Sequence, residues 1–203
     1  MKWSRAVHHL EQLAETCTKM AEGPSDIYRI RVRQLWTFAE MLEPAHDLEW
    51  IPVALAIDLP VDEVAWLTEP LGAEHWSNST RLNRNPFVPR WRSVHAPVWN
   101  HDIVRPVMFW DAENGIVPDA LEALRAGEGA GVRSSAPSAA EFEARMAEEL
   151  ATCLAEVRRC TEVYTEKRWA PGKMTPLADA LWLANVGYLD VLDAIGKHPG
   201  GRQ

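Results

Sequence analysis

The sequence predicts a mixed α/β or α+β fold, in which an N-terminal helix and two long C-terminal helices pack a small mixed sheet. Apolar residues recur every three or four positions near both ends of the 203-residue chain, as on amphipathic helices. Between residues 27 and 111, alternating and continuous apolar runs indicate strands. The apolar fraction of 47% and the charged fraction of 25% are typical of a globular protein with a buried core.

The first predicted helix covers residues 3–22 and ends at Gly23-Pro24. Its apolar stripe consists of Trp3, Val7, Leu10, Ala14, Cys17 and Ala21. A strand is predicted over residues 27–38, because apolar residues there alternate with arginines that face water.

A nearly continuous apolar run over residues 50–58 predicts a buried central strand, with Pro52 near its start. Short helices are expected at 60–67 and 72–84, and a further strand at 103–110. Asn114-Gly115 marks a turn, which leads to a short helix near 118–126. Together these elements make a predicted α/β core domain over residues 1–126.

Residues 127–138 have the glycine- and serine-rich composition of a flexible linker. A long helix over 139–166 follows, since Ser138 and Glu141 have the spacing of a capping box. Its apolar face consists of Phe142, Met146, Leu150, Cys153, Val157, Cys160 and Tyr164.

The last predicted helix has Thr175 as its cap and Pro176 in its first turn, and Gly196 ends it after residue 195. We expect the two helices to form a hairpin over 139–196 that packs on the core, followed by a disordered tail at 197–203.

Composition narrows the class of protein. The net charge of −8 argues against binding to nucleic acid through a basic face. Three cysteines without a CxxC pair indicate reduced thiols and a cytoplasmic protein. Neither a signal peptide nor an apolar run long enough to span a membrane is present. Ten tryptophans predict a tryptophan-rich core, or alternatively a stacking surface for a planar ligand.

One group of candidate site residues is acidic. Asp47 and Glu49 point to the same side of an extended chain, and Asp58 ends the strand that follows. Such carboxylates can bind Mg²⁺ jointly with a substrate phosphate, and no other cofactor is predicted. Arg92 and Arg105, from an arginine-rich stretch, are candidates to contact that phosphate.

The residues around these carboxylates resemble a degenerate polymerase-β-type nucleotidyltransferase core. The similar segments are residues 35–40, Asp47-Leu48-Glu49 and the strand at 53–57. Ala39-Glu40 stands where that family has the Gly-Ser turn that approaches the triphosphate. The resemblance implies nucleotide binding through Asp47 and Glu49.

A closer resemblance is to an uncharacterised actinobacterial family, a domain of unknown function. It rests on residues 53–60 with Trp66-Leu67, and on residues 91–93, 97–101 and 105–107, and so covers most of residues 3–126. It implies no activity.

The segment 91–110 is dense in polar and aromatic side chains. His95 and His101 are candidate general bases, and Trp99 and Asn100 are candidate ligand-binding residues beside Arg92 and Arg105. A structural polar network that holds the prolines and tryptophans of the segment is the alternative.

Three functional hypotheses remain open. The first is a non-enzymatic accessory protein, whose C-terminal helices bind a protein partner or a second copy. The second is a nucleotide-binding protein with the degenerate nucleotidyltransferase-like core. The third is a histidine-dependent enzyme centred on residues 91–110.

Overall fold

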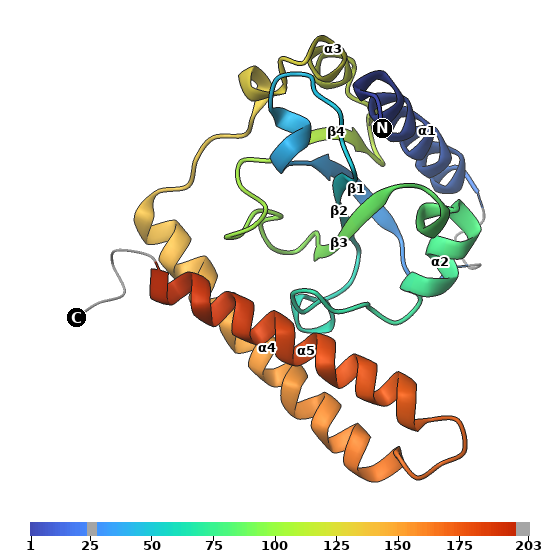
Figure 1. Cartoon of the computed structure of the whole chain (residues 1–203), viewed down its shortest axis with the longest axis vertical. Helices are drawn as coiled ribbons and strands as arrows, with labels where there is room; N and C mark the ends of the chain where they lie inside the picture. The colour runs from blue at the N-terminus through green and yellow to red at the C-terminus, as the bar shows by residue number, and fades with distance from the viewer. Residues whose placement is uncertain (24–27, 198–203) are drawn as a thin grey trace. The chain divides into compact units, whose positions relative to one another are not determined.

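The structure is a computed structural model that describes residues 1–23 and 28–197 (Figure 1). In these residues five strands form one mixed sheet, with an N-terminal helix and two long C-terminal helices, which confirms the mixed α/β class. The chain divides into two compact units. The first comprises Met1–Leu59 and Leu71–Ala136, and the second comprises Pro60–Pro70 and Pro137–Gln203.

The first unit contains the sheet, whose strand order is β3-β2-β1-β4-β5. The strands are β1 (Val32–Thr37), β2 (Ile51–Ile57), β3 (Phe87–Ser93), β4 (Val107–Asp111) and β5 (Gly115–Ile116). β2 and β3 pair in parallel, whereas the other neighbours are antiparallel. The ends of β2, β3 and β4 and the start of β1 therefore share one edge of the sheet.

β2 is the predicted central strand. All seven of its residues are buried, as its continuous apolar run requires. Pro52 is its second residue, close to the strand start where the missing proline N–H does least harm to the ladder.

The other strands differ from their predicted bounds. β1 begins at Val32 rather than at residue 27, which lies outside the described residues. β4 begins at Val107 rather than at residue 103, because Arg105 has a left-handed φ of 46° and Pro106 has no N–H to donate. β3 was not predicted, because Pro89 and two arginines interrupt its apolar pattern. An edge strand tolerates such a proline.

Helix α1 (Trp3–Ala21) buries most of the predicted stripe, although Ala21 itself is exposed. Trp3 Nε1 donates to the carbonyl of Leu124 in α3 (Pro118–Ala126) at 2.8 Å. Trp110 Nε1 donates to Thr18 Oγ1, also at 2.8 Å. These bonds satisfy the indole N–H groups of buried rings, which supports the prediction of a tryptophan-rich core.

Three short segments also differ from expectation. Residues 60–67 contain a 3-10 turn at Val61–Glu63 instead of a helix. The helix expected over 72–84 is α2 (Ala73–Thr80). Residues 127–138, expected to be a flexible linker, contain a 3-10 turn at Gly129–Val132, where Gly129 is buried.

The second unit contains helices α4 (Ala139–Lys167) and α5 (Met174–Lys197), which pack side by side as a hairpin (Figure 1). The predicted capping box is confirmed: Glu141 N donates to Ser138 Oγ, and Ser138 N donates to the Glu141 carboxylate. The predicted ends of α5 were wrong. The helix begins one residue before Thr175 and continues through Gly196 to Lys197, the last described residue.

The three cysteines are free and buried, as predicted. Burial raises the pKa of the Cys17 thiol, and burial with the nearby Glu156 carboxylate raises the pKa of Cys160 to about 11. Among residues 1–23 and 28–197, no helix has the length and apolarity needed to cross a membrane.

Candidate functional site

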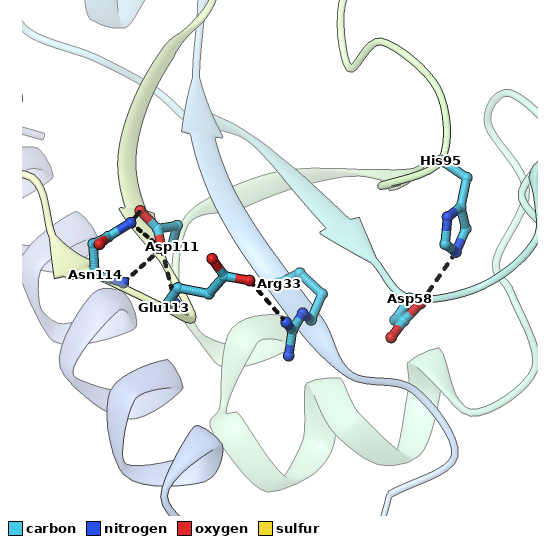
Figure 2. Close-up of polar contacts among 6 residues, drawn as sticks. All are labelled: Arg33, Asp58, His95, Asp111, Glu113 and Asn114. Carbon is cyan, nitrogen blue, oxygen red and sulfur yellow. Dashed lines mark hydrogen bonds and ion pairs between the residues drawn. The ribbon is translucent and has the colours of Figure 1, made fainter.

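Two of the predicted site residues meet where the parallel strands end. Asp58 directly follows β2, and His95 follows β3 by two residues. A hydrogen bond from Val94 N to Ile57 O, 3.0 Å long, holds the two chain ends together. His95 Nε2 lies 3.1 Å from Asp58 Oδ1 (Figure 2). The two side chains are 55% and 47% exposed, so a dissolved ligand can reach them.

The His95–Asp58 pair has the geometry of an oriented base. An ionised carboxylate only accepts hydrogen bonds, so Nε2 carries the proton when His95 is neutral. The lone pair on Nδ1 is then available to accept a proton from a ligand. The sequence predicted His95 as catalytic and Asp58 as a metal ligand, and the structure joins them in one pair.

At the same end of the sheet, the turn between β4 and β5 shows a structural use of a carboxylate (Figure 2). Asp111 Oδ1 accepts the backbone N–H groups of Glu113 at 2.8 Å and of Asn114 at 2.7 Å. Burial alone would raise the pKa of Asp111, but these hydrogen bonds outweigh it and hold the pKa below its ordinary value. The nearby Arg33–Glu113 ion pair, 3.5 Å long, is exposed and contributes little to stability.

The three predicted metal ligands are not brought together. Asp47 and Glu49 precede β2, whereas Asp58 follows it, and seven strand residues span about 20 Å. In the part of the chain that the structure describes, no group of three or more His, Cys, Asp or Glu side chains is arranged to hold a metal ion. Asp47 and Glu49 line a hollow of about 420 Å³ that Glu40 also lines. Binding of Mg²⁺ with a nucleotide there stays a prediction.

In the segment 91–110, the described contacts shape the chain. Asn100 is buried, and its Oδ1 accepts the N–H groups of Asp102 and Ile103, which closes a turn. Arg105 Nε donates to the carbonyl of Ser134 at 2.9 Å and so anchors the segment that leads to α4.

The remaining residues of that segment lie in different surroundings. Arg92 is buried in β3, and His101 is half-buried. Trp99 lines a hollow of about 230 Å³ together with Trp36 and Pro97. The contacts of Asn100 and Arg105 suit the structural alternative, while ligand binding by Arg92, Trp99 or His101 stays a prediction.

In the second unit, one side of α5 is tightly packed. Ala184, Gly187 and Val191 are buried on this side. A Cβ atom on Gly187 would lie 2.1 Å from the carbonyl oxygen of Trp66, so only glycine fits. Trp66 Nε1 donates to Asp190 Oδ2 at 2.7 Å, which ties residues 60–70 to the helix.

The other side of α5 exposes large apolar side chains. Met174, Trp182, Leu189 and Leu192 are 50%, 64%, 54% and 40% exposed. Their spacings of eight, seven and three residues place them on one line along the helix. We call these four residues the outward stripe.

A family model described as a domain of unknown function (DUF7711) matches residues 1–197. The chain belongs to this family. The resemblance to a domain of unknown function is thereby confirmed. The DUF7711 match also covers residues beyond those on which the resemblance rested. The resemblance to nucleotidyltransferases gains no support from it. No curated protein and no solved structure matches.

Sequence reasoning assigned a partner interface to helices 139–195 of the DUF7711 chain but did not single out the outward stripe. The signal is present in the sequence, because residues 174–197 are apolar on both sides of the helix. A helix with one covered face is normally apolar on that face alone.

Proposed function

We propose that this chain is an interaction protein that binds another protein chain through the outward stripe of α5. The supporting observation is a line of four exposed, large apolar side chains on a helix whose opposite side is already packed. Helices that are apolar all round are normally covered all round. Contiguous exposed apolar patches of this kind mark interaction sites.

Covering the outward stripe supplies free energy for binding. Full burial of one large apolar side chain contributes about 1.5–3 kcal/mol, and each side chain of the stripe is roughly half exposed. Trp182 lies near the middle of the stripe, and tryptophan is enriched among residues that dominate binding energy. We therefore expect Trp182 to matter most.

The test places a photo-reactive benzoylphenylalanine at position 182 in the full chain, expressed in its native cell. The matched control carries the same group at Trp50, which is 54% exposed but lies in the first unit. We expect a discrete cross-linked adduct from position 182, none from position 50, and loss of the adduct when Leu189→Asp is added. The absence of an adduct at 182, or identical adducts at both positions, would contradict the proposal.

A second candidate is a catalytic role for His95, oriented by Asp58. Its support is their 3.1 Å contact at the carboxyl ends of two parallel strands, where α/β proteins commonly bind ligands. The test is hydrolysis of p-nitrophenyl acetate and p-nitrophenyl phosphate by the purified chain. The matched control is His8→Ala, because His8 is also exposed, at 60%, but lies on α1. Activity that is lost in His95→Ala and retained in His8→Ala would support the catalytic role. Equal rates in the wild type and His95→Ala count against it.

A further inference from the structure

We infer that the partner of the outward stripe is a second copy of this chain, with the two α5 helices packed antiparallel across a two-fold axis. This inference rests on the proposed function and names its partner. An isologous interface requires a surface that is complementary to itself. Three features of α5 meet that requirement: the position of the apolar side chains, the charges at the two ends, and the helix dipole.

The outward stripe has similar side chains at both ends. Met174 and Leu192 are its outermost members, 18 residues or about 27 Å apart along the helix. When two such helices run antiparallel about the middle of the stripe, Met174 of each copy lies opposite Leu192 of the other. Trp182 then lies close to the two-fold axis, so the largest side chains of both copies share the centre of the interface.

Charge distinguishes the antiparallel from the parallel arrangement. Lys173 directly precedes α5, while Asp193 lies near its other end, on the side of the stripe. Both side chains are exposed, and neither forms an ion pair with a described residue. The antiparallel arrangement places Lys173 of one copy beside Asp193 of the other, twice per dimer. A parallel pair would place like charges together.

Two further basic residues lie near Lys173. Lys167 and Arg168 lie at the same end of the hairpin as Lys173, and Arg168 stacks on the Trp169 ring at 4.3 Å. At the opposite end of α5, Asp193 is followed one turn later by Lys197, while Asp190 accepts the hydrogen bond from Trp66. Antiparallel helices also oppose their macrodipoles favourably.

The first test is sedimentation equilibrium of the purified full chain, up to its highest soluble concentration. We expect a dimer for the wild type and for Trp50→Asp, the matched exposed control. Trp182→Asp should weaken association about a hundredfold or more, since it places a charge at the centre of the interface.

The second test reverses the charges. Asp193→Lys and Lys173→Asp should each weaken the dimer about tenfold, because two ion pairs become like-charge contacts. The double variant Asp193→Lys, Lys173→Asp should recover wild-type association. Both positions are exposed, and circular dichroism will show that the helices are retained.

Each outcome bears on a different claim. A wild type that stays monomeric would overturn the inference that the partner is a second copy. An adduct of a different mass from position 182 in cells would then leave the proposed function standing. If Trp182→Asp does not weaken the dimer, the outward stripe is not its interface. Failure of the double reversal to restore association overturns the antiparallel arrangement.

Discussion

The contact between Gly187 and residues 60–70 yields a prediction with a built-in control. An alanine Cβ at position 187 would lie 2.1 Å from the carbonyl oxygen of Trp66, a backbone atom that cannot rotate away. Non-bonded heavy atoms need about 3.5 Å, so the segment must move from α5 by roughly 1 Å. That displacement stretches the 2.7 Å hydrogen bond from Trp66 Nε1 to Asp190 beyond bonding distance.

The magnitude follows from three contributions. Overpacking of a tight contact costs about 1–3 kcal/mol. Loss of a hydrogen bond to a carboxylate costs about 1.5–3 kcal/mol. The higher helix propensity of alanine returns about 1 kcal/mol. We therefore expect Gly187→Ala to lower the free energy of unfolding by about 3 kcal/mol.

The assay is urea unfolding of the full chain, followed by far-ultraviolet circular dichroism, with Gly196→Ala as control. Gly196 lies in the same helix, and a Cβ added there would have no atom within 4 Å, so alanine should stabilise by up to about 1 kcal/mol. The two substitutions thus have opposite expected signs. A Gly187→Ala variant as stable as the wild type would refute the packing of residues 60–70 on α5.

Three further substitutions test the local structure by the same unfolding assay. Ser138→Ala removes the capping box with Glu141 and should cost about 1 kcal/mol; an unchanged midpoint would contradict the cap. Gly127→Ala should cost about 2 kcal/mol, because Gly127 has a φ of 72° and its Cβ would lie 2.8 Å from Ala45 N; a neutral effect would be inconsistent with that backbone. The folded state lowers the pKa of Asp111, so its stabilising contribution is complete above the ordinary aspartate value of about 3.9 and is lost as pH falls through the lower folded value. Asp111→Ala should therefore destabilise at neutral pH, and the gap from the wild type should close as pH falls through the folded pKa of Asp111, whereas a gap that does not narrow in acid would rule out this carboxylate as its source.

Several elements could be predicted because their signals are local. The four-and-three spacing from Trp3 to Cys17 predicted α1, and the apolar run around residues 51–57 predicted β2. Ser138 with Glu141 predicted where α4 begins. Each of these depends on neighbouring residues along the chain, so periodicity and capping chemistry are sufficient.

Other elements had no local signal. β3 contains Pro89 and arginines, and it forms because it can pair in parallel with β2. The paired residues Val53 and Pro89 are 36 positions apart in the sequence. Gly196 does not end α5 as predicted, since the helix reaches Lys197, although no atom lies within 4 Å of a Cβ added at Gly196. For β3, tertiary pairing outweighs local preference.

Local sequence was enough to show which segments are helical or extended, and that His95 and Asp58 have side chains suited to chemistry. That these two residues meet depends on the three-dimensional fold, because parallel pairing of β2 and β3 brings their ends to one edge. The fold likewise determines that Ala184 and Gly187 are covered while Trp182 and Leu189 remain exposed. An apolar pattern shows that a helix face avoids water, but the surfaces available to pack against it determine which face is covered.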